Sequence, residues 1–117
     1  MNGGILVREK IKNSNIIVIK IGTSTLTYET GKLNLNRLDK IVRVISDLNN
    51  SGKNVVLVSS GAIAVGMSKL GMTIRPKSVK EKQAIAAVGQ CELMSIYDRL
   101  FSEYSTVVAQ MLLTGDV

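Results

Sequence analysis

Residues 16–22 read IIVIKIG, and residues 55–61 read VVLVSSG. Both are short, nearly continuous runs of β-branched and aliphatic residues that end in a turn-forming glycine. Runs of this kind are typical of strands in a parallel sheet that is buried on both faces. We therefore expect strands at residues 16–21 and 55–58, side by side and covered by helices.

The segment between these runs has the pattern of an amphipathic helix. Apolar residues recur at spacings of three and four between residues 35 and 48. Asn34 stands at the N-cap position, and Gly52 follows the end of the pattern. Strand, helix and strand in succession form a βαβ unit, whose crossover is right-handed in nearly all proteins.

Two further helices are expected after the second strand. Residues 62–70 have helical character, and residues 79–103 form a longer helical segment that opens with a capping box, Ser78 followed by Glu81. Gly89 lies inside the longer helix, where a glycine costs about 1 kcal/mol relative to alanine. We expect a kink or a close contact between helices at this glycine.

A third apolar run, TVVAQMLL at residues 106–113, predicts a third strand. The elements together predict an α/β fold: a three-layer, open, mostly parallel sheet with helices on both faces. Such a sheet ordinarily has more strands to cover its edges. We therefore expect residues 15–117 to be one incomplete domain whose uncovered edges favour self-association into a homo-oligomer. Residues 1–14, before the first predicted strand, are expected to be an N-terminal extension.

The composition excludes several kinds of active site. The 117 residues include no His, so catalytic triads that use His, His-ligated metals and imidazole acid–base catalysis are excluded. A single thiol forms no intramolecular disulfide, and Cys91 in an apolar stretch is expected to be buried in a reducing compartment. With no signal peptide and no long apolar run, we expect a cytoplasmic protein that does not enter the membrane.

The net charge of +6 points to an anionic partner. One Phe and three Tyr give almost no surface on which bases could stack, so we expect no nucleic-acid function. An anionic small molecule is the better match. Neither G-x-x-x-x-G-K-[ST] nor G-x-G-x-x-G occurs, and acidic residues are scattered, so any Mg²⁺ would be held chiefly by a nucleotide.

The loops that follow the predicted strands carry the candidate site. They span residues 22–25, 59–62 and 114–116, and they are small and rich in hydroxyls, with backbone N–H groups open to an anion. Glycine and serine also simply terminate strands, and Asp116 is equally well explained as a turn former. Lys20, near the end of the first strand, either extends to solvent or reaches an anion beside these loops.

Four stretches resemble the glutamate 5-kinase family of the amino acid kinase superfamily. They are VIKIGTS (18–24), VSSGAIAVG (58–66), KQAIAAVGQ (82–90) and QMLLT (110–114). The first is shared loosely across the superfamily, whereas SSGAIA and KQAIAAVGQ are much more particular to glutamate 5-kinases. The resemblance runs from about Asn15 to the last residue, and it implies the amino acid kinase fold.

The resemblance implies phosphorylation of the γ-carboxylate of L-glutamate by ATP with Mg²⁺, the first step of proline biosynthesis, commonly with feedback inhibition by proline. It places Lys20 on the transferring phosphates. Gly22, Thr23 and Ser24 form the loop beside those phosphates, and Ser60, Gly61 and Ala62 lie on the glutamate side.

Family members continue well beyond this point, with a second phosphate-binding lysine, an organising aspartate, a glutamate-binding segment and the adenine pocket. By this resemblance, residues 15–117 are the N-terminal half of an amino acid kinase domain, and we expect the chain alone to be inactive. Two alternatives stay open. One is another amino acid kinase, for carbamate, acetylglutamate or uridylate; the other is a non-catalytic oligomerisation or interaction fragment.

Overall fold

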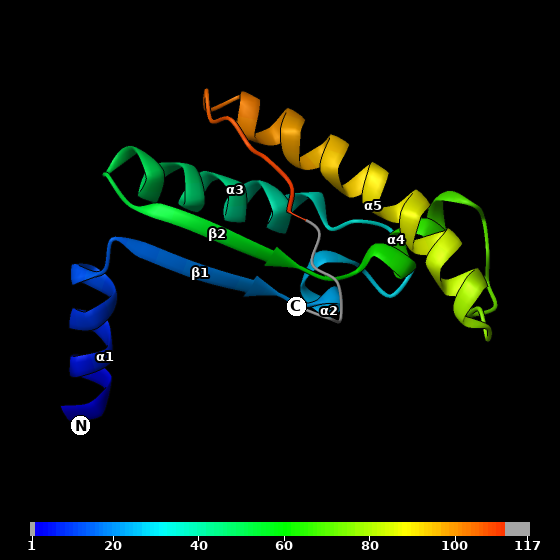
Figure 1. Cartoon of the computed structure of the whole chain (residues 1–117), viewed down its shortest axis with the longest axis horizontal. Helices are drawn as coiled ribbons and strands as arrows, with labels where there is room; N and C mark the ends of the chain where they lie inside the picture. Colours follow the sequence, from blue (N-terminus) through cyan, green and yellow to red (C-terminus); the bar gives the residue numbers. More distant parts are fainter. Residues whose placement is uncertain (1, 112–117) are drawn as a thin grey trace.

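The computed structural model describes residues 2–111 (Figure 1). A two-stranded sheet lies beneath two long helices, and a further helix precedes the sheet. The elements are α1 (Asn2–Asn13), β1 (Ile16–Ile21), α2 (Thr23–Leu26), α3 (Leu35–Asn50), β2 (Asn54–Ser59), α4 (Ala62–Lys69) and α5 (Val79–Ser102). None of the helices within residues 2–111 is long and apolar enough to cross a membrane.

β1 and β2 pair in parallel, from Ile16 opposite Asn54 to Ile21 opposite Ser59. The parallel pairing and the mixed order of helices and strands confirm the predicted α/β class with a parallel sheet. The helix between the strands is also confirmed: the Asn34 Oδ1 atom accepts a hydrogen bond from the Arg37 backbone N–H at 3.1 Å, and the buried side of α3 packs in the core. The N-cap therefore fixes where α3 begins.

The two faces of the sheet differ. Ile19, Val55 and Leu57 pack against the core under α3 and α5, whereas the side chains that alternate with them are exposed. The exposed large apolar residues of this face, which we call the open sheet face, are Ile16, Val18, Val56 and Val58. The prediction that both strands are buried on both faces is thus wrong, because no helix within residues 2–111 lies over this second face (Figure 1).

The predicted third strand is also wrong over residues 106–111, which contain no strand. Thr106 donates its backbone N–H to the Phe101 carbonyl at 3.0 Å, which closes the end of α5, and the Val107 side chain is 95% exposed. An apolar run forms a strand only when a neighbouring strand satisfies its backbone groups, and this segment has none among the described elements. Residues 112 and 113 lie outside the described residues.

α5 begins at the predicted cap, where the Ser78 Oγ atom accepts the Glu81 backbone N–H at 3.1 Å. Gly89 is buried against α4, which confirms the close contact between helices. Cys91 is exposed, so its predicted burial is wrong. The reason is helical geometry, because residues two positions apart on a helix face different directions, and Gly89 faces the core.

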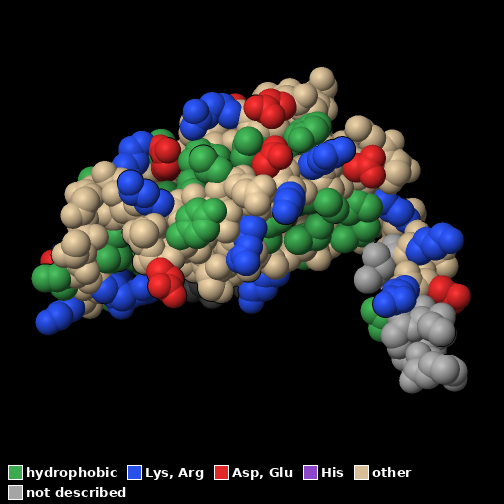
Figure 2. Space-filling view, turned by 180° about the vertical axis from the view of Figure 1, so that it is seen from behind, with side chains coloured by type: hydrophobic (Ala, Val, Ile, Leu, Met, Phe, Trp, Pro, Cys, Tyr) green, Lys and Arg blue, Asp and Glu red, His purple; other side chains and the backbone are tan. Residues whose placement is uncertain are grey.

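Charged side chains are spread over the surface. On the face seen in Figure 2, Lys and Arg side chains stand among acidic and hydrophobic ones instead of gathering in one patch. The excess of positive charge is therefore distributed on this face.

Candidate functional site

The carboxyl ends of the two strands are tied together by Ser60. Its backbone N–H and its Oγ atom both donate to the Ile21 carbonyl oxygen, each at 3.0 Å. The chain after β2 is thereby held against the chain after β1. Two of the three loops predicted to form one site do lie side by side; residues 114–116, with Asp116, lie outside the described part of the chain.

The two loops meet most closely at Thr23 and Gly61. Gly61 has φ +100°, a left-handed conformation that favours glycine. A Cβ atom at this position would lie 3.5 Å from the Leu26 Cδ1 atom and 3.7 Å from the Thr23 Oγ1 atom. Gly61 therefore allows the turn from β2 into α4 while the first loop packs directly beside it.

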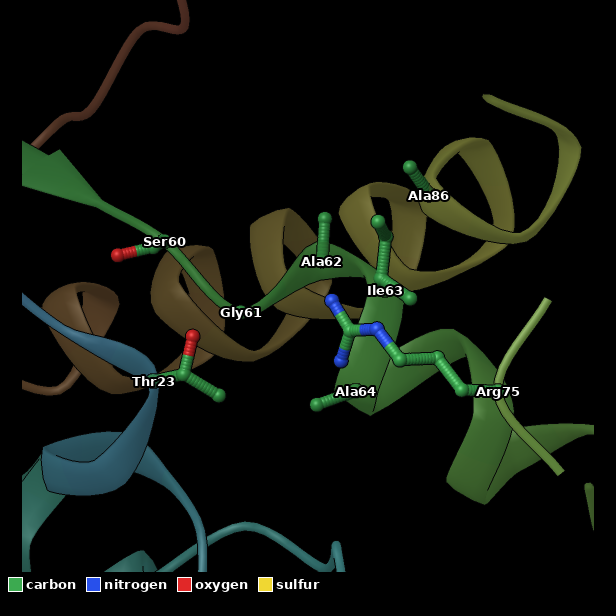
Figure 3. Close-up of a pocket in the computed structure, with 8 residues that line it drawn as sticks. All are labelled: Thr23, Ser60, Gly61, Ala62, Ile63, Ala64, Arg75 and Ala86. Atoms are coloured by element: carbon green, nitrogen blue, oxygen red, sulfur yellow. The ribbon is translucent and has the colours of Figure 1, made fainter. Parts of the chain in front are cut away.

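A hollow of about 310 Å³ opens at this junction (Figure 3). Its lining residues are Thr23, Ser60, Gly61, Ala62, Ile63, Ala64, Arg75 and Ala86. Four of these were predicted as site residues from the sequence: Thr23, Ser60, Gly61 and Ala62. The hollow thus combines two hydroxyls, the first turn of α4 and several small apolar groups.

The first turn of α4 supplies backbone donors to the hollow. Val65 donates its N–H to the Gly61 carbonyl at 2.9 Å, which is the first hydrogen bond of the helix. The N–H groups of residues 62–64 precede it and have no partner within the helix, and all three residues line the hollow. Unpaired N–H groups at a helix N-terminus favour an anion.

The remaining predicted residues lie outside the lining of this hollow. Lys20 is exposed, in register with Val58 on the open sheet face. Gly22 is the N-cap of α2 and accepts the Thr25 backbone N–H at 3.1 Å, while Ser24 is exposed in the same short helix. Lys20, Gly22 and Ser24 are therefore not among the residues that line the hollow, although Gly22 and Ser24 flank Thr23, which does.

The sequence reasoning missed Arg75. Figure 3 shows its side chain extending from the segment between α4 and α5 toward the first turn of α4. It is the one charged residue among the eight that line the hollow. The signal available in the sequence was its position, directly before Pro76 in the break between two helices.

α5 holds α4 in place from behind the hollow. A Cβ atom at Gly89 would lie 1.7 Å from the Ala62 carbonyl oxygen, and one at Gly66 would lie 2.1 Å from the Ile85 carbonyl oxygen. The two helix backbones therefore touch. At the surface, Lys69 pairs with Glu92 across the same helices, and this hydrogen bond holds the pKa of the Glu92 carboxyl below its ordinary value.

β2 is joined to α5 next to the hollow by Ser59 and Tyr97. The two hydroxyl groups form a hydrogen bond of 2.9 Å. Burial raises the pKa of the Tyr97 phenol above 10.0, and the Ser59 hydrogen bond acts in the opposite direction. Tyr97 therefore stays a neutral hydrogen-bonding group that fixes the end of β2 on α5.

Comparison with known proteins places these features in a family. The model of the amino acid kinase family matches residues 15–117. Glutamate 5-kinases from Clostridium perfringens, Listeria innocua and Enterococcus faecalis are 61%, 57% and 52% identical to this chain over 111 residues. The alignments cover 95% of this chain and 40–41% of those relatives, so the chain spans about two fifths of their length. The chain belongs to the amino acid kinase family.

Proposed function

We propose that this chain contributes the glutamate side of a glutamate 5-kinase, which transfers the γ-phosphoryl group of ATP to the γ-carboxylate of L-glutamate. The hollow at Ser60, Gly61 and Ala62 carries the proposal, because it joins a helix N-terminus and a guanidinium at one anion-binding position. The identity to proteins named glutamate 5-kinase supports the choice of substrate.

The absence of histidine is compatible with this reaction. A glutamate carboxylate has a pKa of about 4.3, so at pH 7 it is already an anion and attacks phosphorus without a general base. The protein has to hold the two anions in line and neutralise the charge that develops between them. Backbone amides and cationic side chains can do both.

On the glutamate side, we assign Ser60, Gly61 and Ala62. The Ser60 side chain is fixed by its hydrogen bond to the Ile21 carbonyl, so its position is set before substrate arrives. The positive φ of Gly61 turns the chain so that α4 starts at Ala62, beside the hollow. A preorganised cradle of this kind binds a carboxylate with little loss of conformational entropy.

On the phosphate side, we assign Lys20, Gly22, Thr23 and Ser24. Thr23 lies at the boundary, because it lines the hollow while it begins α2 directly after β1. Lys20 is exposed near the carboxyl end of β1, one residue before Ile21. An ammonium group at that place can neutralise the transferring phosphate, as in other phosphoryl-transfer sites.

Magnesium enters this proposal bound to the phosphates of ATP. Within residues 2–111, no three Cys, Asp or Glu side chains gather where they could hold a metal ion. We therefore assign no Mg²⁺ ligand among these side chains and no step to a metal held by them. From the resemblance to glutamate 5-kinases, we further propose a cytoplasmic enzyme of proline biosynthesis that forms a homo-oligomer and is inhibited by proline.

The open sheet face favours the second candidate function, a non-catalytic interaction fragment. Its exposed apolar side chains on both strands could pair with another molecule. The motifs SSGAIA and KQAIAAVGQ argue against a third candidate, a kinase for carbamate, acetylglutamate or uridylate.

A fusion protein tests the proposal. Residues 1–117 are joined to the part of the Clostridium perfringens relative that follows its matched region, and γ-glutamyl phosphate is trapped with hydroxylamine. We expect product with glutamate and ATP from the fusion protein and none from the 117-residue chain alone. Product with carbamate, N-acetylglutamate or UMP but not with glutamate would overturn the substrate assignment, and no product at all would favour the interaction fragment.

A further inference from the structure

We propose that Arg75 is a substrate-binding residue whose guanidinium pairs with the α-carboxylate of the amino acid substrate. This inference rests on the proposed function and deepens it. Glutamate carries two carboxylates, and the γ-carboxylate must face the phosphate. The α-carboxylate then needs its own partner, which the sequence motifs do not name.

The backbone is held on both sides of Arg75, whose side chain is exposed. At the start of its segment, Met72 donates its backbone N–H to the Met67 carbonyl at 2.8 Å. Pro76 directly after Arg75 is buried, and α5 begins two residues later at the Ser78 cap. The segment that carries Arg75 is therefore anchored to α4 and α5, so its side chain starts from a defined place beside the hollow.

The charge of Arg75 is available to a ligand. The other seven residues that line the hollow are uncharged. No Asp or Glu oxygen in the described part of the chain lies within 4.0 Å of its guanidinium, since the only such ion pair there joins Lys69 and Glu92. A guanidinium next to unpaired helix N–H groups forms a strong carboxylate site, because it binds both carboxylate oxygens with two parallel hydrogen bonds.

The same arrangement favours the amino acid over ATP as the ligand of Arg75. Arg75 lines the hollow together with Ser60, Gly61 and Ala62, whereas Lys20, assigned to the phosphates, lies outside it. Ile63 and Ala86 add apolar wall to the hollow. That surface suits the methylene groups of an amino acid side chain better than a triphosphate.

A protection experiment on the fusion protein, which also carries the part of the relative that follows its matched region, tests the contact directly. Phenylglyoxal modifies exposed arginines, and mass spectrometry of peptides follows Arg75 and, in the same sample, Arg43 on the exposed side of α3. We expect L-glutamate and L-glutamine to slow the modification of Arg75 at least about threefold and to leave Arg43 unchanged. Isoglutamine, in which the α-carboxylate is an amide, should not protect Arg75. Equal rates with and without glutamate would overturn the inference.

Kinetics of the fusion protein give the second test. Arg75→Leu should raise the KM for glutamate about tenfold and change the KM for ATP less than about twofold, since one charged hydrogen-bond pair is lost. Arg75→Lys should recover part of the loss, and Arg43→Leu is the matched control. If the parent fusion protein is active and Arg75→Leu leaves the KM for glutamate unchanged, the inference is overturned while the proposed function stands. A parent without glutamate kinase activity would overturn the proposed function, and the inference with it.

Discussion

Gly89 on α5 lies directly against the backbone of Ala62, the first residue of α4, so that a Cβ atom at position 89 would lie 1.7 Å from the Ala62 carbonyl oxygen. Ala62 also lines the hollow. The N-terminus that presents backbone donors to the hollow is thus held by direct contact between two helix backbones, a contact that only glycine permits.

Replacing Gly89 with alanine should destabilise the protein, although alanine is the better helix former. The gain in helix propensity is about 1 kcal/mol. The added methyl group meets backbone atoms that cannot move aside, and overpacking of this kind costs about 3 kcal/mol. We expect a net loss of about 2 kcal/mol in the free energy of unfolding, measured by urea titration with circular dichroism.

Ala87 provides the control for this experiment, because it lies on the exposed side of the same helix. Ala87→Gly should lose only the propensity difference of about 1 kcal/mol. A Gly89→Ala protein as stable as the parent would show that α4 and α5 can separate without penalty.

Tyr97 should make the protein less stable in alkali. Burial raises the pKa of its phenol above 10.0, so the folded state resists ionisation more than the unfolded state does. This contribution is fully present below the unfolded pKa of about 10 and is lost as the pH rises through the folded pKa. Urea titrations from neutral pH to about pH 11 should show a falling free energy of unfolding.

Tyr97→Phe should flatten this alkaline decline while costing about 1 kcal/mol at pH 7, because Ser59 loses its hydrogen-bond partner. Tyr28 is more than half exposed, and Tyr28→Phe should leave the decline unchanged. If the free energy of unfolding of Tyr97→Phe falls as steeply in alkali as that of the parent, the alkaline loss of stability does not come from Tyr97.

Lys20→Met in the fusion protein should lower kcat about a hundredfold and change the KM for glutamate much less. Lost neutralisation of the transition state costs on the order of 3 kcal/mol. Lys40→Met is the control, since Lys40 is exposed on α3. An unchanged kcat, or equal changes in both parameters, would remove Lys20 from the phosphate site.

Ser60→Ala in the fusion protein should act mainly through glutamate and raise its KM. The hydroxyl lines the hollow and is held by the Ile21 carbonyl. Ser102→Ala is a matched control, because its Oγ atom also donates to a backbone carbonyl, that of Asp98, at the far end of α5. A titration of initial rate against glutamate that gives the parental KM would exclude this role for Ser60.

The 117-residue chain should self-associate through the open sheet face. Exposed valines on neighbouring strands form an apolar surface, and within residues 2–111 the outer edge of each strand has no partner strand. Light scattering at tens of micromolar should show species larger than a monomer. The double variant Val18→Thr and Val56→Thr should shift the protein toward monomer. Val44→Thr is the control and should not, because Val44 is an exposed valine of α3, away from the open sheet face. A clean monomer in the parent would contradict this prediction.

Local sequence patterns were sufficient to predict where two helices begin and where two helices touch. Asn34 and Ser78 begin their helices where the cap pattern predicts, because a cap is a hydrogen bond between residues three positions apart. The glycine at position 89 was likewise readable as a close contact, since an otherwise unfavourable residue inside a helix needs a packing reason.

Which surfaces are covered and which side chains meet could not be predicted from local patterns and was established by the packing of distant elements. The runs at β1 and at residues 106–111 are both predicted strands, yet the first pairs with β2 and the second pairs with no described strand. Arg75 lines the hollow and Lys20 does not, although both are cations near predicted loops. Whether a side chain is buried, and which side chains meet at one site, depends on contacts between residues far apart in the chain. Local periodicity carries no information about which distant elements will pack together.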